Sequence, residues 1–147
     1  MIPKRSYKRR PQKMGAGWGK ANAHTPTYGI QQVVDPGFSF LANWTFDTPP
    51  WTIDNDGLSC DGSQGGASIA AGDTTTIKAG TTYRVIFMLA ISAGQVQATI
   101  GSTAGTARTT SGFYIEEIVT TDTDGIELLA DASFVGAIER VTVEEVF

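Results

Sequence analysis

The strongest constraint on the fold is the alternation of side chains in residues 81–91. Every second residue of this run is large and apolar, namely Tyr83, Val85, Phe87, Leu89 and Ile91. A period of two is that of a β-strand, whose successive side chains point to opposite faces of a sheet. The intervening residues also include Ile86 and Met88. We therefore predict a central strand with one face in the core and the other partly covered.

Other strand-like runs follow one another along the chain, and turn residues separate them. They cover residues 38–41, 51–53, 58–60, 67–70, 74–78, 95–100, 113–120, 126–130 and 138–146. No segment shows a helical period, and short strands with regular turn signals are typical of sandwiches. We predict an all-β fold, an antiparallel β-sandwich (jelly roll) over residues 37–147. The expected core is Tyr83, Val85, Phe87, Leu89, Val96, Ile100, Phe113, Ile115, Val141 and Val143.

Charge divides the chain into two parts. Residues 1–24 hold seven of the eleven Lys and Arg residues and no acid, which leaves four basic and fifteen acidic residues in the other 123, a net charge of −11. Such asymmetry is typical of a basic tail that meets an acidic partner, attached to an acidic body. We therefore predict an extended basic N-terminal arm over residues 1–36. A solubilising leader without a partner is the simpler alternative.

Prolines and glycines interrupt the arm, and no apolar period runs through it, so we expect it to lie extended outside the sandwich. Its charged and aromatic side chains are the expected partner-binding residues, namely Lys4, Arg5, Tyr7, Lys8, Arg9, Arg10, Lys13, Trp18, Lys20 and Tyr28. Aromatics and glycines separate the charges, and the acidic body repels phosphate. A neighbouring protein subunit is therefore favoured over nucleic acid as the partner.

Groups that carry catalysis are scarce. The one histidine, His24, lies in the arm, and we expect Cys60 to pack as a small apolar residue. The adjacent pairs Glu116–Glu117 and Glu144–Glu145 point to opposite faces of a strand and cannot act together. Asp54 and Asp56 are more typical of a turn than of a calcium site. We predict no enzyme activity, no catalytic residues, no cofactor and no metal.

The chain contains no apolar run long enough to span a membrane and no secretory signal pattern, so we expect no membrane association. Trp44 and Trp51 are candidate sugar-binding residues, because flat aromatic rings on a sandwich can stack on pyranose rings. Packing in the core is the alternative for these two residues.

Several segments resemble one family in the right order. Residues 43–53, with the pattern N-x-x-F-D-x-x-x-W-x-I, resemble the opening of carbohydrate-binding-module-like jelly rolls, which recur in virion proteins of tailed bacteriophages. Residues 79–87 resemble the central strand of such modules, residues 101–106 the hairpin that follows, and residues 134–143 the closing strand. The resemblance implies the jelly-roll fold and leaves the ligand open.

A short jelly roll with a basic arm also resembles the small proteins that decorate viral shells. We therefore expect a bacteriophage virion structural protein, a capsid decoration or cement protein that attaches through its arm to the major capsid protein or another virion subunit. It is expected to form homo-oligomers and to reside in the virion after assembly in the host cytoplasm. One alternative is a carbohydrate-binding tip module of a tail or head fibre that recognises a surface glycan. Another is a small icosahedral coat protein whose arm binds nucleic acid.

Overall fold

The computed structural model describes residues 24–55 and 57–147, and nearly all of its regular structure is β-strand. Eleven strands form two antiparallel sheets, and one short 3-10 turn at Leu41–Asn43 precedes the second strand. This confirms the predicted all-β sandwich. Turns separate the strands, as the sequence pattern indicated. Two of the predicted runs are not strands, because residues 38–41 lead into the 3-10 turn and, of residues 74–78, only Thr74 forms a bridge, to Val33.

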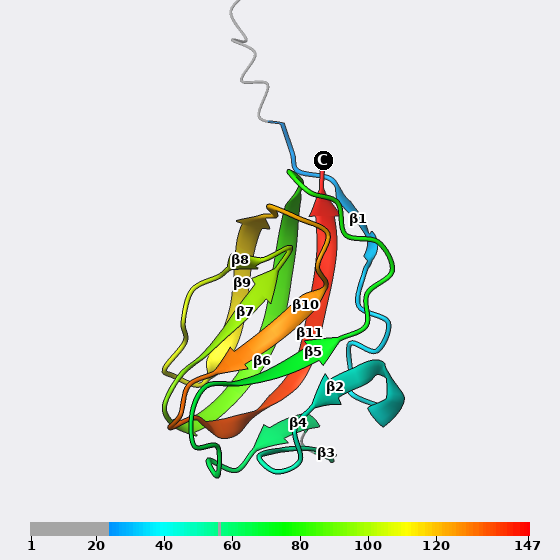
Figure 1. The fold of residues 1–147 in the computed structure, drawn as a ribbon. Coiled ribbons are helices and arrows are strands. Elements are labelled where there is room, and N and C mark those ends of the chain that lie inside the picture. Colours follow the sequence, from blue (N-terminus) through cyan, green and yellow to red (C-terminus); the bar gives the residue numbers. More distant parts are fainter. Residues whose placement is uncertain (1–23, 56) are drawn as a thin grey trace, which may run out of the picture.

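The first sheet has six strands and contains the run that the sequence marked as central (Figure 1). Its order is β3-β4-β11-β6-β9, and β1 pairs with β11 beside this path. The strands are β1 Tyr28–Gln31, β3 Trp51–Asp54, β4 Gly57–Cys60, β6 Thr82–Ala93, β9 Gly112–Val119 and β11 Val135–Val146. Because β6 lies between β11 and β9, the prediction of a central strand is confirmed.

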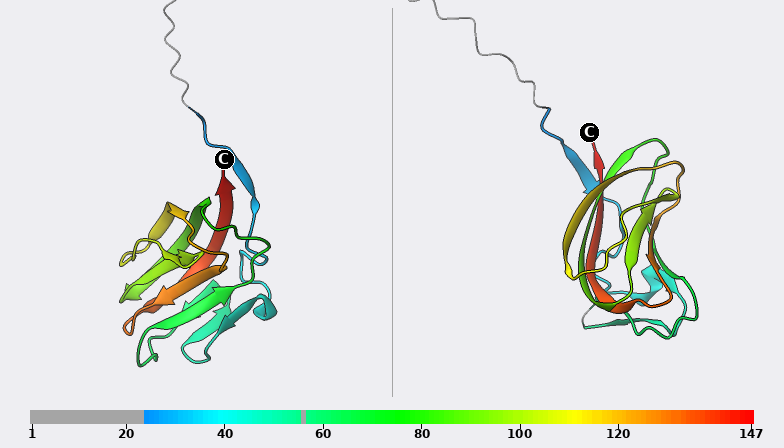
Figure 2. Two further views of the ribbon diagram at one scale, coloured as in Figure 1. Left: turned by 45° about the horizontal axis from the view of Figure 1, so that its top comes forward. Right: turned by 90° about the vertical axis from the view of Figure 1, so that its left-hand side faces the viewer.

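The second sheet has five strands in the order β2-β5-β10-β7-β8. They are β2 Trp44–Phe46, β5 Ser68–Gly72, β7 Val96–Ile100, β8 Thr103–Ala104 and β10 Ile126–Ala130. The right-hand view of Figure 2 shows the two sheets as separate layers. Each layer therefore has an inner face in the core and an outer face turned away from it.

The core lies between the two inner faces. The predicted core residues of β6, β7 and β11 are buried, among them Phe87, Ile100 and Val141. At one end of the sandwich the Trp51 and Phe134 rings pack with centroids 5.9 Å apart. The turn between β6 and β7 uses Gly94 at φ +72°, where a Cβ atom would lie 2.3 Å from the Phe134 amide nitrogen. Glycine is therefore required at this close approach.

Strand β9 faces the opposite way from our prediction. Phe113 and Ile115, expected in the core, are exposed, while Ile118 is buried and the Tyr114 ring lies 5.4 Å from that of Phe87. Glu116 also points inward, and its carboxylate pairs with Arg108 at 3.1 Å. Pairing with β6 decides this choice, because a shift of one residue would exchange the two faces of the strand.

Residues 24–36, assigned to the arm from the sequence, lie on the sandwich in the structure. Strand β1 is antiparallel to β11, with Tyr28 opposite Val146, and Val33 is buried in the core. The Asp35 carboxylate accepts the amides of Ser39 and Phe40 at 2.9 and 2.7 Å. The folded body therefore begins before residue 37. The other predicted arm residues, from Lys4 to Lys20, lie outside the described residues.

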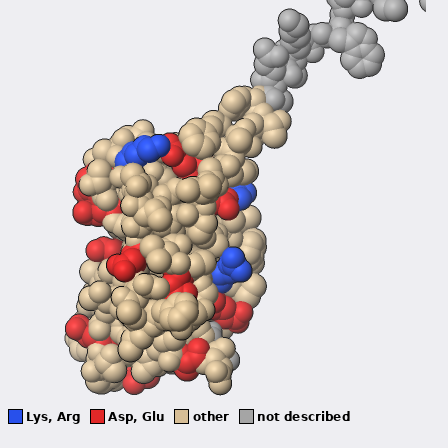
Figure 3. Space-filling model, turned by 90° about the vertical axis from the view of Figure 1, so that its right-hand side faces the viewer, with Lys and Arg blue, Asp and Glu red and all other residues tan. Residues whose placement is uncertain are grey.

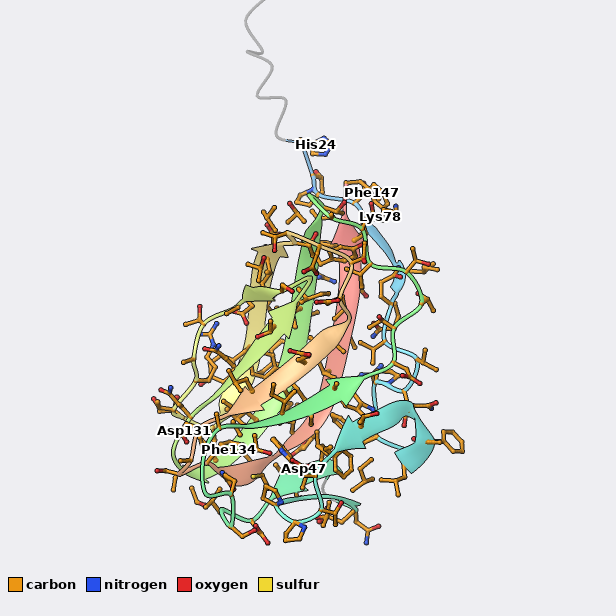
Figure 4. All side chains as sticks on the ribbon, in the orientation of Figure 1. His24, Asp47, Lys78, Asp131, Phe134 and Phe147 are labelled. Carbon is orange, nitrogen blue, oxygen red and sulfur yellow. The ribbon has the colours of Figure 1, made fainter. Side chains whose placement is uncertain are left out.

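The first described residue lies beside the C-terminus. His24 Nε2 donates a hydrogen bond to the carbonyl of Phe147 at 2.9 Å. Figure 4 shows His24, Lys78 and Phe147 together at one end of the sandwich, with Asp131 and Phe134 at the other end. The described part of the chain therefore begins at the end of the sandwich where β11 finishes.

Candidate binding surface

The outer face of β9, β6 and β11 brings together side chains from three distant segments. Across these strands Phe113 lies opposite Met88, which lies opposite Arg140 on β11. The next row contains Ile115, Ile86 and Thr142 in the same order. Four large apolar side chains, Ile86, Met88, Phe113 and Ile115, thus form one surface, which we call the apolar strip.

The apolar strip is open to solvent. Phe113 is 61% exposed, Ile115 54% and Met88 41%. A shallow depression of about 240 Å³ lies in this face, and its lining includes Ile86, Met88, Phe113, Arg140 and Thr142. Contiguous exposed apolar groups with a polar rim are typical of interaction sites. The strip is therefore our candidate binding surface.

Arg140 stands at the rim of this depression and is exposed. The four basic residues in the described part of the chain are Lys78, Arg84, Arg108 and Arg140. The first three pair with Glu145, Glu144 and Glu116, whereas no carboxylate of the described residues pairs with Arg140. A free guanidinium beside an apolar depression is suited to a carboxylate of a partner.

A bulge in β11 positions Arg140. The register with β6 shifts between Ile138 and Arg140, so that Glu139 is the extra residue on β11. Ile138 and Val141 remain buried on either side of the bulge. Bulges re-aim single side chains without disturbing the rest of a sheet. The bulge thus lets both Glu139 and Arg140 face solvent while the flanking residues stay in the core.

At the other end of the same face, the arginine is paired within the protein. Arg84 donates to the Glu144 carboxylate, and its guanidinium carbon lies 3.5 Å from the centroid of the Tyr28 ring. The hydrogen bond to Glu144 is the main cause that raises the pKa of Arg84 above its ordinary value. Tyr28, predicted as an anchor in a free arm, is thus engaged by its own sheet. Among the described residues, the unpaired basic group is therefore Arg140, whereas the exposed Glu117, opposite Arg84 on β9, is an unpaired acidic group at this end.

The two predicted sugar-binding tryptophans are not on the surface. Trp44 is 4% exposed and Trp51 is fully buried. The Trp44 indole donates to the carbonyl of Asp35 at 3.0 Å, and that of Trp51 donates to Ser68 Oγ at 2.9 Å. Neither ring presents a face to a ligand, so the sugar platform expected at Trp44 and Trp51 is wrong. Core packing, the alternative, is what the structure shows.

Residues 24–55 and 57–147 contain no cluster of side chains suited to metal binding. No three His, Cys, Asp or Glu side chains in these ranges lie close enough to hold a metal ion. Cys60 is buried, as predicted, and its thiol donates to Gln64 Oε1 at 3.4 Å. Burial raises the pKa of the Cys60 thiol, which keeps it in the unreactive protonated form.

Acidic side chains are spread over the face drawn in Figure 3, with few basic ones among them. This agrees with the acidic body inferred from the sequence. The described residues contain no helix that is both long and apolar enough to cross a bilayer.

Comparisons with known proteins give no family. No family model matches the chain, and neither does any curated protein. Solved carbohydrate-binding modules are similar in structure. A variant of the family 29 module CBM29-2 has a TM-score of 0.47 at 13% identity, covering 83% of this chain and 84% of that one. Another CBM29-2 variant, complexed with mannohexaose, has a TM-score of 0.45 at 11% identity, covering 83% and 90%.

The family 35 module from Paenibacillus barcinonensis has a TM-score of 0.43 at 12% identity, covering 81% of this chain and 97% of that one. Likeness at these levels carries no argument about the ligand of this chain. The fold assignment rests on its own strands and registers.

Sequence reasoning did not find this surface, although two signals of it were present. Ile86 and Met88 lie on the second face of the central run, where an ordinary solvent-facing strand would carry polar residues. In residues 113–119, both alternating sets contain large apolar side chains, Phe113 and Ile115 in one and Tyr114 and Ile118 in the other, so one apolar set must lie on the outer face. Nothing in the sequence marks Arg140, because its importance comes from the missing carboxylate partner, which is a property of the fold.

Proposed function

We propose that this chain is a non-catalytic binding protein that docks through the apolar strip and Arg140. The observation that carries the proposal is the continuous row of exposed Phe113, Met88 and Arg140, which has no ion pair among the described residues, on the outer face of the six-stranded sheet. The shape of the site also supports it, since a shallow depression on a sheet suits a partner surface better than an enclosed reaction site.

Within this class we propose a capsid decoration or cement protein of a bacteriophage. The support comes from the sequence: its resemblance to jelly rolls of phage virion proteins, and the seven basic residues of the first 24. Residues 1–23 would add a second attachment to the major capsid protein or another virion subunit. Two weak contacts on one chain, repeated over a symmetric shell, give high avidity.

The test is cosedimentation of the purified full-length protein with particles of the virus whose genome encodes it. We expect binding at a fixed ratio to the shell subunit. Phe113→Ala and Arg140→Gln should each weaken binding by tenfold or more, since interface aromatics and arginines are frequent hot spots. Glu127→Gln, on the outer face of the five-stranded sheet, is the matched control and should bind as the wild type does.

A deletion of residues 1–23 tests the arm separately. The deletion should end there because β1 and Val33 belong to the sandwich. The shortened protein should keep its circular-dichroism spectrum and lose most of its attachment. Full occupancy by the shortened protein would exclude the arm as an anchor. Tight binding of the intact protein to DNA or RNA that collapses as salt rises would support the coat-protein alternative instead.

Glycan binding is the second candidate, and the composition of the depression favours it. The exposed Phe113 ring could stack on the apolar face of a sugar, while Arg140 and Thr142 supply hydrogen-bond groups beside it. A glycan array probed with the wild type and with Phe113→Ala separates the two candidates. Binding that is lost with Phe113, together with no cosedimentation, would replace the decoration proposal with a carbohydrate-binding module of a fibre.

A further inference from the structure

Strand β9 leaves a long edge of the six-stranded sheet unpaired. Its eight residues pair with β6 on one side, and no backbone-to-backbone hydrogen bond joins β9 to any other described strand or loop. The contacts of the preceding loop with β9 are made through side chains, such as the hydrogen bond from the Thr106 amide to the Glu116 carboxylate. The other strands at the ends of the two sheets are shorter, with four residues in β3, three in β2 and two in β8. The β9 edge is therefore the longest site in the described fold where another strand could add.

Nothing on β9 prevents such pairing. Natural sheets protect long edges with lysine, proline, bulges or inward charges that leave the edge unusable. β9 contains no lysine or proline, and its register with β6 runs from Gly112 to Val119 without a shift. Its one inward charge, Glu116, is neutralised by Arg108. The exposed side of the strand carries three apolar residues and one charge, namely Phe113, Ile115, Val119 and Glu117.

The register shows which backbone groups are free. Thr120 donates its amide to the Thr81 carbonyl, and the Ile91 amide is satisfied by Ser111 Oγ on the β9 side of β6. In an antiparallel pair such groups alternate, so Gly112, Tyr114, Glu116 and Ile118 direct their amides toward β6. Phe113, Ile115, Glu117 and Val119 direct theirs to the open edge.

We propose that β9 pairs antiparallel with β9 of a second copy, around a two-fold axis at Ile115. Repulsion between glutamates of the two copies favours this register over its neighbours. An axis at Glu116 or Glu117 would place two like carboxylates directly opposite each other, which is destabilising. With the axis at Ile115, Phe113 lies opposite Glu117 of the second copy and Tyr114 opposite Glu116. An axis at Tyr114 also avoids like charges, but it leaves fewer residues of the strand paired.

This pairing would join two six-stranded sheets into one and place the two apolar strips side by side. The pairing goes beyond the proposed function and is independent of the docking partner, because it needs only the chain itself. A single strand edge makes a small interface, so we expect association to be weak and dependent on concentration.

Sedimentation velocity of the full chain, over roughly 1–500 µM, tests the association. The mass should rise from 15.6 kDa toward twice that value. Ile115→Pro removes an amide that points to the open edge, and proline is tolerated at such positions, so this variant should stay folded and monomeric. Ile115→Lys keeps the backbone and should weaken association at least tenfold. Ile69→Lys, at an exposed apolar residue of β5, is the matched control and should associate normally.

Oxidative cross-linking tests the register. Cysteines at position 115 would face each other across the axis with Cα atoms about 5.5 Å apart, within the range of a disulfide. Cysteines at position 119 would lie roughly 26 Å apart. Ile115→Cys should therefore form a disulfide-linked dimer and Val119→Cys should not, and the buried Cys60 adds little background.

A constant mass of 15.6 kDa over the whole concentration range would overturn the proposal. Equal weakening by Ile115→Lys and Ile69→Lys would overturn it as well. Cross-linking at position 119 that matches that at position 115 would overturn the register. These outcomes are read without any docking partner, so they are distinct from failure of the decoration proposal.

Discussion

The outer faces of the two sheets carry different side chains, although both sheets are built from strands that alternate between an inner and an outer face. On the five-stranded sheet the rows are Ile69–Leu129–Gln97 and Ala71–Glu127–Thr99, in which apolar and polar side chains are mixed. On the six-stranded sheet the apolar residues of two rows are contiguous, and Arg140 and Thr142 stand at their rim. Folding requires apolar residues only on the inner faces, so the apolar strip calls for an explanation outside folding.

The largest expected effect tests whether the strip contributes to the core. Phe87 and Phe113 lie on neighbouring strands, one on the inner face and one on the outer face. Phe87→Ala should lower the free energy of unfolding by about 3–5 kcal/mol, because it leaves a cavity. Phe113→Ala should change it by less than about 0.5 kcal/mol, as expected for an exposed site. Urea denaturation measures both. Similar losses for the two variants would show that Phe113 is packed and is not available to a partner.

A smaller effect, on particle binding, should follow from changing the charge of Arg140. Arg140→Gln removes the unpaired guanidinium from the six-stranded face, and Arg140→Lys keeps the charge but loses the planar fork that binds carboxylates through two hydrogen bonds. We expect particle binding to fall in the order wild type, Arg140→Lys, Arg140→Gln, with an unchanged melting temperature. If Arg140→Gln binds particles as tightly as the wild type, the guanidinium does not make the outer face of the six-stranded sheet a better binding surface than that of the five-stranded sheet.

The smallest expected effect is on the pH dependence of stability, and it comes from Cys60 on the inner side of the six-stranded sheet. The pKa of Cys60 is raised by burial, so the folded protein keeps the thiol protonated where the unfolded chain ionises. This contribution leaves stability unchanged below the ordinary thiol pKa of about 8.5 and lowers it as the pH rises further. The wild type should lose slightly more stability than Cys60→Ala between neutral and alkaline pH, measured by thermal melting. Equal slopes for the two proteins would indicate that the thiol is solvated.

Much of the fold could be predicted from the sequence because its strongest signals are local. The alternation in residues 81–91 places Tyr83, Val85 and Phe87 inside, and each is buried. Turn residues such as Gly94 mark where strands end, because few residues adopt their backbone conformation. The charge division between residues 1–24 and the body is likewise a property of composition alone.

The candidate site could not be predicted in this way. Phe113 and Ile115 belong to a strand with apolar residues on both faces, and the period of two does not say which face turns inward. Trp44 and Trp51 were candidates because tryptophan serves both cores and binding sites, and burial alone distinguishes the two roles. The half-buried, inward-pointing Glu116 looks solvent-facing in the sequence, because its partner Arg108 reaches it only in the folded chain.

The sequence by itself determined that this chain forms strands, that they pack as a sandwich, and that its charge is divided between a basic N-terminus and an acidic body. These properties depend on neighbours in the chain and on composition. The tertiary structure alone decided which face of β9 is exposed, which described arginine has no carboxylate partner among residues 24–55 and 57–147, and which long strand edge stays open. Each of these depends on pairing between residues far apart in sequence, and such pairing leaves no periodic trace in either segment alone.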